Sequence, residues 1–305
     1  MPLTAKITNI SRTSLHDGPG VRTVVYFKGC GLRCVWCHNP ETTEFSQEIL
    51  HAPVKCIHCG KCIMLCPEHH AVLDDQMIFN RDGCSLCGKC AKECPTGALL
   101  QTGENKSIED LMAEIKKDAA YYEATGGGVT LSGGECLLQA DFCAELLRAC
   151  KTEGINTLIE TALFVPWQNV EKVLPFCDAF FADLKLPSPE KHKEFTGQDN
   201  SLILENLSRL VSSKKSSVTV RIPLIPNVND GISHMAEFAK LLLPLAKDLC
   251  GVELLRYNNL AQSKYTQLSR EYRNFGSPQT KEQIQRLCFE LEAHLQSKTK
   301  VFAKI

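Results

Sequence analysis

The sequence lacks three features that would place it at a membrane, on nucleic acid or outside the cell. No apolar run approaches the roughly 18 residues that a transmembrane helix needs. The formal net charge is −1, and basic runs such as Lys214–Lys215 are only two residues long, so we expect neither a nucleic-acid partner nor a membrane partner. Residues 1–15 contain no apolar core of a secretory signal, which predicts a cytoplasmic protein.

Cysteine, by contrast, is abundant. The chain has 305 residues, of which 44% are hydrophobic and 23% charged, an ordinary composition for one large globular domain or two smaller ones. Of its 17 cysteines, 11 fall in three groups before residue 95. Disulfides are rare in a reducing compartment, so grouped cysteines there indicate metal ligands.

The first group is Cys30, Cys34 and Cys37, spaced C-x3-C-x2-C, directly after the apolar run 21–28 that we predict to be a strand. A closed iron–sulfur cluster or a structural zinc site takes four protein ligands, so three thiolates leave one metal position open for chemistry. Two alternatives stand beside this interpretation. CVWCH matches the short C-x2-C-H haem-attachment pattern, and Cys30 could be a buried core thiol beside an ordinary metal pair.

The second and third groups repeat one pattern. Residues 56–67 and 84–95 both read C-x2-C-x2-C-x3-C-P, the run of bacterial ferredoxins that carry two four-iron clusters. The fourth cysteine of each run then ligates the other cluster. The predicted ligand sets are Cys56, Cys59, Cys62 and Cys94 for one cluster, and Cys84, Cys87, Cys90 and Cys66 for the other. A pair of zinc knuckles is the alternative. We expect residues 53–102 to form a small inserted domain that folds around metal.

Outside this insert, apolar strands alternate with amphipathic helices. Ser107 with Asp110 approximates a helix-capping box, and Gly154 is typical of a helix end. Such alternation predicts an α/β fold with a parallel sheet, either open or closed as a barrel, with functional residues at the carboxyl ends of strands. The predicted strands are 21–28, 129–131, 157–160, 179–184, 218–222 and 252–255, and the predicted helices are 107–123, 138–153, 167–173, 202–211, 235–243 and 281–294.

Four motifs together resemble a known family. C-x3-C-x2-C with Trp36 before its last cysteine resembles the signature of the radical S-adenosylmethionine superfamily. HDGPGVRT at 16–23, TLSGGECLLQ at 130–139 and ADLK at 182–185 are similar to motifs of one branch, the activating enzymes of glycyl radical enzymes. The resemblance covers essentially the whole chain, and the insert places it with the branch members that carry a ferredoxin-like domain. It implies a partial (β/α)6 TIM-like barrel, residues 1–52 and 103–305, interrupted by the two-cluster insert at 53–102.

The resemblance implies a reaction and its partners. Such enzymes cleave S-adenosylmethionine reductively, and the 5′-deoxyadenosyl radical takes a hydrogen from a glycine of a partner glycyl radical enzyme. The cofactors would be three [4Fe-4S] clusters and S-adenosylmethionine, with flavodoxin or ferredoxin as electron donor. The insert clusters would relay electrons or serve structure alone. Two other functions stay open: a radical enzyme acting on a small molecule, and an electron carrier of the two-cluster ferredoxin type.

Roles for individual residues follow from the same resemblance. Cys30, Cys34 and Cys37 would hold the catalytic cluster, and Asp17 would face the glycine-bearing segment of the partner, although Asp-Gly-Pro-Gly is also a good turn by itself. In related enzymes an acidic pair, here Glu160 and Asp183, helps Thr161 to hold a monovalent cation. The S-adenosylmethionine site would comprise Trp36, Gly133, Gly134, Glu135, Glu160, Thr161, Asp183, Lys185, Arg221 and Asn258.

Several of these residues have a plainer explanation. Asp183 with Lys185 could be a structural ion pair, and Arg221 could be a structural arginine rather than a ligand for a carboxylate. Asn258 stands where smaller relatives have a histidine that contacts the nucleoside, although an amide can hydrogen-bond a ribose. Core packing is expected for Cys143, Cys150, Cys177, Cys250 and Cys288, and less so for Cys136. The spacing of His38, His69 and His70 indicates no metal site.

Overall fold

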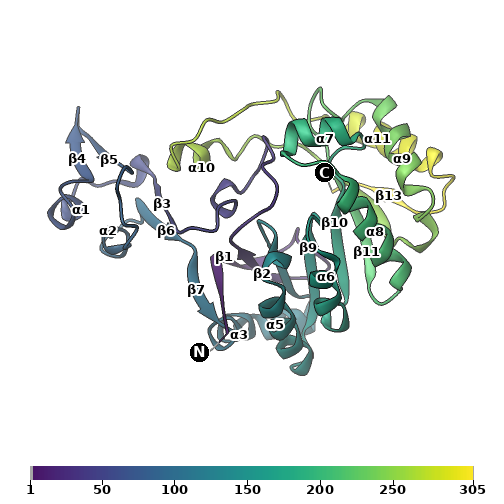
Figure 1. Cartoon of the computed structure of the whole chain (residues 1–305), viewed down its shortest axis with the longest axis horizontal. Coiled ribbons are helices and arrows are strands. Elements are labelled where there is room, and N and C mark those ends of the chain that lie inside the picture. The colour runs from purple at the N-terminus through teal and green to yellow at the C-terminus, as the bar shows by residue number, and fades with distance from the viewer. Residues whose placement is uncertain (1–2, 305) are drawn as a thin grey trace.

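The computed structural model describes residues 3–304, and its largest element is a sheet of nine strands (Figure 1). The strand order is β13-β12-β11-β10-β9-β8-β2-β1-β7. Strands from β2 through β8 to β13 run parallel, and β1 and β7 add an antiparallel edge. The strands are β1 (Thr4–Ser14), β2 (Arg22–Phe27), β7 (Glu104–Ser107), β8 (Gly128–Gly133), β9 (Asn156–Thr161), β10 (Ala179–Asp183), β11 (Ser217–Pro223), β12 (Gly251–Leu255) and β13 (Val301–Phe302).

Helices follow the parallel strands, which confirms the predicted α/β alternation. In Figure 1, α5, α6 and α8 lie beside β9, β10 and β11. The predicted bounds 167–173 and 281–294 agree with the observed ones. No helix within the described part of the chain is long and apolar enough to cross a membrane. The helices are α3 (Ile108–Ile115), α4 (Ala119–Thr125), α5 (Ala140–Thr152), α6 (Trp167–Val173), α7 (Pro189–Thr196), α8 (Ser201–Ser213), α9 (Ile232–Leu242), α10 (Gln262–Gln267) and α11 (Lys281–His294).

The core lies between the sheet and these helices. Cys143 and Cys150 are fully buried on α5, and Cys177 is 4% exposed, so the expected core packing of these three is confirmed. Cys136 is also fully buried. Cys250 is exposed, so its predicted burial is wrong; it directly precedes β12, where the chain enters the sheet from its surface. Cys288 on α11 is only half-buried.

The structure differs from the sequence prediction at both sheet edges and in three helices. Strands β1, β7 and β13 were not predicted, nor were α7 and α10. The predicted helix 107–123 begins as expected, with the Ser107–Asp110 capping box, but a 3-10 turn over Lys116–Asp118 divides it. Asp118 is fully buried there and accepts hydrogen bonds from Arg12 and the Thr23 hydroxyl. The turn therefore places Asp118 in a buried polar contact with strands β1 and β2. The helical spacing of apolar residues does not predict such a contact.

The cysteine-rich segment 53–102 projects from one end of the sheet, at the left of Figure 1. A short antiparallel pair, β3 (Glu48–His51) with β6 (Leu99–Thr102), joins it to the rest of the chain. Its own elements are brief: α1 (Lys61–Leu65), the hairpin β4 (His70–Leu73) with β5 (Gln76–Phe79), and α2 (Lys89–Lys92). Its apolar core consists of four buried residues of the segment, Met77, Phe79, Cys90 and Leu99, together with Ile49 of β3.

Candidate functional site

A cavity of about 470 Å³ opens at the carboxyl ends of the parallel strands. Its volume lies within the range of small-molecule sites. The loops after β2, β8, β9, β10, β11 and β12 all contribute to its wall, as expected where parallel strands end at one edge. Of the predicted site residues outside the cysteine-rich segment, all except Glu135 line it: Asp17, Cys30, Cys34, Trp36, Cys37, Gly133, Gly134, Glu160, Thr161, Asp183, Lys185, Arg221 and Asn258.

The three-cysteine loop is held from two sides by backbone hydrogen bonds. On one side, Gly29 and Cys30 donate to the carbonyls of Thr42 and Thr43 at 2.7 and 3.0 Å. On the other, Arg33 and Val35 donate to carbonyls at the end of α7, at 2.7 and 3.0 Å. The surrounding chain therefore fixes the backbone of the loop, and the Arg33 guanidinium adds donations to the Cys30 and Leu32 carbonyls at 2.6 and 3.0 Å.

The thiols of this loop sit in a dry environment. Burial raises the pKa of Cys30 to about 11 and that of Cys34 to about 12. Metal-free thiols here are thus protonated at neutral pH, and binding a metal must release their protons. Burial alone would lower the pKa of Lys185, but the Asp183 carboxylate, 2.7 Å away, and the nearby Cys34 raise it, so Lys185 stays charged beside the three sulfurs.

Trp36 anchors the same loop. It is 6% exposed and packs against Phe195 and Phe275, with ring centroids 5.7 and 5.9 Å apart. The predicted aromatic position before the last cysteine is therefore part of an apolar cluster behind the loop, and it also reaches the cavity wall.

The Gly-Gly-Glu segment joins the end of β8 to the cysteine loop. A Cβ at Gly133, where φ is +117°, would lie 2.3 Å from backbone atoms of Phe27, and a Cβ at Gly134 would lie 2.3 Å from the Gly29 carbonyl. Glu135 donates its backbone N–H to that carbonyl at 2.7 Å. Close approach of the backbone therefore requires glycine at both positions, and both glycines also line the cavity.

Glu135 lies beneath the cavity rather than in its wall. Its side chain is 1% exposed and accepts hydrogen bonds from the Thr161 hydroxyl at 2.8 and 2.9 Å and from the Ala162 and Leu137 backbones at 3.0 and 3.2 Å. Burial raises its pKa to about 7, against the effect of these donors. The Glu135 carboxylate therefore links the ends of β8 and β9 under the site.

Charged groups at the strand ends form a buried network. Arg221 donates to Glu160 at 2.5 Å and to Glu253 at 2.7 Å, and its guanidinium lies 4.0 Å from the Phe181 ring centroid. A third donation, at 3.1 Å, reaches the carbonyl of His16. Arg221 therefore connects three strands to the loop at 16–20, and it also lines the cavity.

Glu253 is a cavity residue that the sequence analysis missed. It is 1% exposed, lines the cavity, and its Oε1 atom has no hydrogen-bond partner in the structure. The signal was a single carboxylate inside the otherwise apolar strand 251–255. A lone buried charge in a strand calls for a partner, which here is Arg221.

The loop at 16–20 closes one side of the cavity. Asp17 accepts a hydrogen bond from the Ser14 hydroxyl through its side chain and one from the Thr130 hydroxyl, at 2.7 Å, through its carbonyl. Gly20 has a φ of +66°, and a Cβ there would lie 2.5 Å from the Gly127 nitrogen. The segment is a turn fixed to the sheet, and His16 and Asp17 still line the cavity.

Asn258 lies where the cavity meets the end of the cysteine loop. Its side-chain nitrogen is 3.2 Å from Nδ1 of His38. Burial lowers the pKa of His38, so a neutral imidazole and an amide form this part of the wall. Both can donate and accept hydrogen bonds, which suits the hydroxyl groups of a nucleoside.

One predicted set of cysteines in the cysteine-rich segment shares a cavity. A small cavity of about 40 Å³ is lined by Cys56, Cys59, Cys62 and Cys94, the first predicted set. Cys66 belongs to the neighbourhood of the second set: burial, the adjacent Glu68 and then Cys84 and Cys90 raise its pKa to about 11. The crossing of the fourth cysteines is thus compatible with the folded chain.

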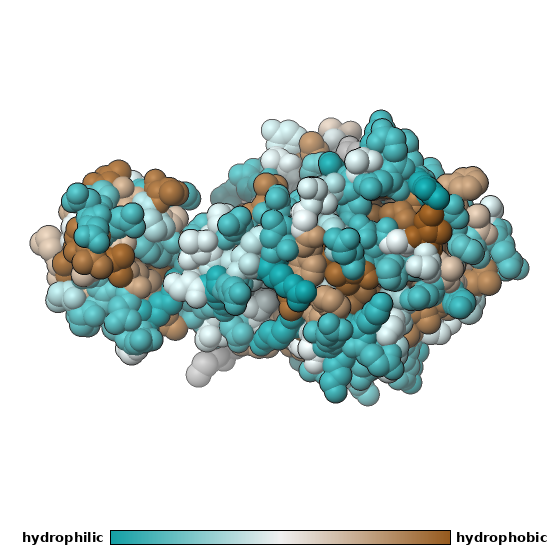
Figure 2. All heavy atoms as spheres, turned by 90° about the horizontal axis from the view of Figure 1, so that it is seen from above, coloured by the Kyte–Doolittle hydropathy of each residue, from teal (hydrophilic) through white to brown (hydrophobic). Residues whose placement is uncertain are grey.

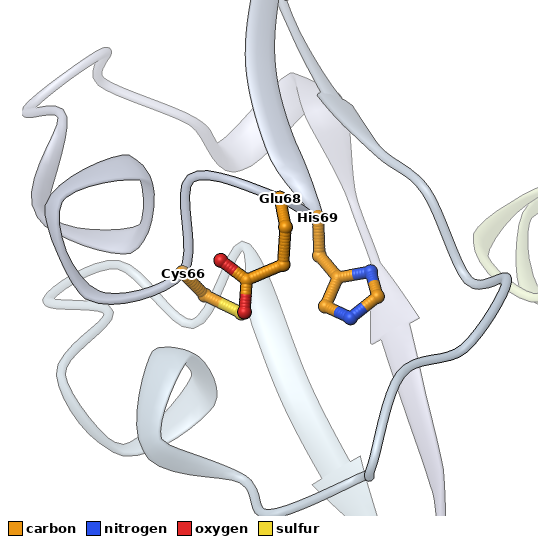
Figure 3. A group of neighbouring side chains, drawn as sticks. All are labelled: Cys66, Glu68 and His69. Carbon is orange, nitrogen blue, oxygen red and sulfur yellow. The ribbon is translucent and has the colours of Figure 1, made fainter.

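One group beside the second set was not predicted. Donor atoms of Cys66, Glu68 and His69 lie within 4.8 Å of one another (Figure 3). The Cys66 thiol donates to the Glu68 carboxylate at 3.3 Å. His69 thus shares a potential ligand group that sequence spacing did not indicate, but the group competes for a cysteine of the second set.

Known proteins match this chain over most of its length. Residues 24–241 match the family model of the radical SAM superfamily, where SAM is S-adenosylmethionine. The chain is 42% identical over 274 residues to the (2S)-3-sulfopropanediol dehydratase activating enzyme of Klebsiella oxytoca, covering 88% of this chain and 86% of that protein. It is 42% identical over 282 residues to the choline trimethylamine-lyase activating enzyme of Oleidesulfovibrio alaskensis, covering 90% of each.

A solved structure shares the fold. Streptococcus suis SuiB bound to the precursor peptide SuiA superposes with a TM-score of 0.57 over 95% of this chain and 49% of that one, at 12% identity. The fold, the cavity and the two sequence comparisons agree. The chain belongs to the radical SAM superfamily and, within it, to the activating enzymes of glycyl radical enzymes.

Proposed function

We propose that this protein installs a glycyl radical in a partner enzyme after reductive cleavage of SAM in the sheet-edge cavity. The observation that carries the proposal is one cavity with Cys30, Cys34 and Cys37 in its wall and the glycine-rich loop of Asp17 at its side. Cys30, Cys34 and Cys37 would hold a [4Fe-4S] cluster, which would supply the electron for cleavage of the sulfonium C–S bond of SAM to methionine and the 5′-deoxyadenosyl radical that takes hydrogen from the partner's glycine.

The residues of the cavity fit such a cluster and its ligand. Thiolates are the ligands that iron–sulfur clusters use, and three of them would leave one metal position without a protein ligand. The charged Lys185 offsets negative charge that the three thiolates bring into a buried site. Backbone at Gly133 and Gly134, which no side chain shields, would receive the ammonium end of SAM. His38 and Asn258 would hold the nucleoside end.

Arg221 and the loop of Asp17 would position the partner. The guanidinium holds Glu160 and Glu253 on the sheet and the His16 carbonyl on the loop. A glycine presented beside this loop would thus meet a fixed surface. Hydrogen abstraction depends on placing the reacting atoms within about an ångström, which favours a loop tied to the sheet over a mobile one.

Around this site we assign the remaining features that the resemblance implies. The parallel strands form a partial (β/α)6 barrel made of residues 1–52 and 103–305. A monovalent cation would bind beside Thr161 and Asp183. All 17 cysteines are free thiols, which supports a reducing, cytoplasmic location.

Residues 53–102 would form a ferredoxin-like domain with two further [4Fe-4S] clusters, three in all. The cavity of Cys56, Cys59, Cys62 and Cys94 supports the first of the two sites. The segment buries few apolar side chains, so bound metal would contribute much of its folding free energy. Low-potential clusters suit a relay from flavodoxin or ferredoxin, since ferredoxin clusters reach about −400 mV.

Anaerobic reconstitution tests the function directly. The protein is loaded with iron and sulfide, reduced with dithionite and given SAM, and 5′-deoxyadenosine is quantified. Choline trimethylamine-lyase and sulfopropanediol dehydratase, the enzymes named with its relatives, are then added, and the glycyl radical is read by electron paramagnetic resonance. We expect cleavage without a partner and a radical on a glycyl radical enzyme. Absence of SAM cleavage would favour the electron-carrier alternative. SAM cleavage that yields a product from a small molecule but no protein radical would favour the small-molecule alternative.

A further inference from the structure

Exposed apolar side chains concentrate in the first half of the cysteine-rich segment. Val54 is 96% exposed, Met64 85%, Ile57 63% and Val72 54%. Figure 2 shows brown, hydrophobic residues on the lobe at its left, which is this segment. Between residues 84 and 97, the second cysteine run, no large hydrophobic residue is exposed to this degree. Large exposed apolar surface on a soluble domain marks an interaction site, so the two halves of the segment face different surroundings.

Part of this apolar surface is the rim of the cavity that gathers the first cysteine set. Ile57 and Val72 line that cavity together with Lys61, and Cys59 beside them is exposed. A molecule seated on the rim would therefore touch the residues that enclose the proposed cluster. Because electron tunnelling weakens steeply with distance, a redox partner must dock where a cluster lies close to the surface.

Lys61 is the one charged residue among those that line this cavity, and the exposed Asp74 and Asp75 lie beyond Val72 on the hairpin. No aspartate or glutamate occurs between Glu48 and Glu68, while Lys55 and Lys61 are both exposed. A second copy of the chain on the same rim would place these lysines against each other, which is unfavourable. A partner with carboxylates around its own redox centre would instead meet opposite charges and an apolar surface.

We infer that Ile57, Val72 and Lys61 form the docking face for a small acidic electron-carrier protein, which delivers one electron per docking event to the cluster held by Cys56, Cys59, Cys62 and Cys94. This inference rests on the proposed function of the segment. The apolar pair supplies the buried centre of the interface. Lys61, with Lys55 nearby, steers the acidic partner and makes association dependent on salt.

Binding of oxidised flavodoxin to the reconstituted protein tests the docking face. Val72→Glu places a charge in the apolar centre of the face, on β4 and away from the cysteine ligands in sequence. Lys61→Glu reverses the charge of the steering lysine. Phe289→Glu is the matched control, because Phe289 is 72% exposed on α11. We expect Val72→Glu to raise the dissociation constant measured by calorimetry at least tenfold. Lys61→Glu should raise it severalfold and make it less dependent on salt. Phe289→Glu should bind as the wild type does, and iron content should be equal in all variants.

Reduction assays separate this inference from the proposed function. Flavodoxin-driven cleavage of SAM should slow in Val72→Glu and Lys61→Glu, while dithionite-driven cleavage stays at the wild-type rate. Unchanged flavodoxin binding in both variants, or no binding of flavodoxin or ferredoxin to the wild type, would overturn the docking face. The docking face would also be overturned if the variants bound flavodoxin normally but had lost affinity for the glycyl radical enzyme or had lost a dimer detected by sedimentation. Failure of dithionite-driven cleavage in the wild type contradicts the proposed function instead.

Discussion

The loop of Cys30, Cys34 and Cys37 and the segment 53–102 both gather cysteines, but they are supported differently. The loop leaves the end of β2 and is fixed by backbone hydrogen bonds to Thr42, Thr43 and the end of α7. The segment has two helices of five and four residues and a core of five buried side chains. The first is shaped by a large sheet, whereas the second has little to shape it except its own cysteines.

This difference matches two chemical demands. Hydrogen transfer to one chosen carbon needs positions set in advance, and the sheet edge provides them through Glu135, the glycine turn and Arg221. Electron transfer needs proximity and a suitable potential but little geometric exactness at the donor side. If the segment relays electrons as proposed, a small segment organised by bound metal would be sufficient for that task.

The largest effect is expected from the cysteine loop. Replacing Cys30, Cys34 and Cys37 by Ala should abolish 5′-deoxyadenosine formation, because no open metal position would remain. The insert should keep about eight of about twelve irons, as two closed four-iron clusters would. Iron analysis and product chromatography check both numbers. Deoxyadenosine from the triple variant would place the catalytic metal elsewhere, and zinc in the insert would favour the knuckle interpretation.

Removing the metal should sharpen the contrast in rigidity. After iron is chelated, amide hydrogen exchange in residues 56–94 should accelerate strongly, because few buried contacts hold that segment. Residues 29–37 should keep most of their protection, since their hydrogen bonds go to the sheet domain. Mass spectrometry of peptic peptides resolves the two regions. Equal loss of protection in both would show that the sheet does not pre-form the cysteine loop.

Asp17→Ala should separate the partner from SAM. The side chain accepts a hydrogen bond from Ser14 and helps shape the loop beside the cavity. A displaced glycine could reduce radical transfer about a hundredfold, whereas uncoupled SAM cleavage should stay nearly intact. Electron paramagnetic resonance of the partner measures the first quantity and deoxyadenosine the second. A normal glycyl radical yield in this variant would show that the loop is only a turn and does not position the partner.

Cys87→Ala should act on the relay alone. Cys87 is exposed and belongs to the second predicted ligand set. We expect severalfold slower SAM cleavage with flavodoxin as the reductant and a smaller change with dithionite, which can reach the catalytic cluster directly. The ratio of the two rates is the measurement. Equal slowing with both reductants would mean that the segment serves structure, not electron transfer.

The smallest effect concerns Glu135 and pH. Burial raises its folded-state pKa to about 7, above the value of about 4.3 in an unfolded chain. The folded state therefore binds the extra proton, and this contribution to stability declines as pH rises from about 4 to about 7. Between pH 6 and pH 8 the loss is about 1 kcal/mol. Glu135→Gln should remove that part of the pH dependence, as measured by urea unfolding of the reconstituted protein. An unchanged slope would contradict the raised pKa.

Much of the site followed from strand-end motifs. Gly133, Thr161 and Asp183 could be placed at one edge because parallel strands end together. The sequence could not show that the Glu135 side chain turns under the cavity, since a turn residue can point either way. Glu253 escaped notice because its partner, Arg221, lies 32 positions away in sequence. Such pairs depend on strand register, which periodicity does not specify.

The edges of the fold were harder to predict for the same reason. Strands β1 and β7 pair with each other across about a hundred residues, and local pattern carries little information on such pairing. The hairpin β4–β5 is short and mostly exposed. The crossing cysteine sets of the insert stay a prediction from spacing, with which the shared cavity of Cys56, Cys59, Cys62 and Cys94 is consistent.

Electron–nuclear double resonance with labelled SAM tests the central claim most directly. SAM carrying ¹⁷O in its carboxylate is added to the reduced protein, and hyperfine coupling to each cluster signal is recorded. We expect coupling to one cluster only, which disappears in the Cys30, Cys34 and Cys37 triple variant and persists in Cys87→Ala. Coupling that survives in the triple variant, or that is lost in Cys87→Ala, would contradict the assignment of SAM to the sheet-edge cavity.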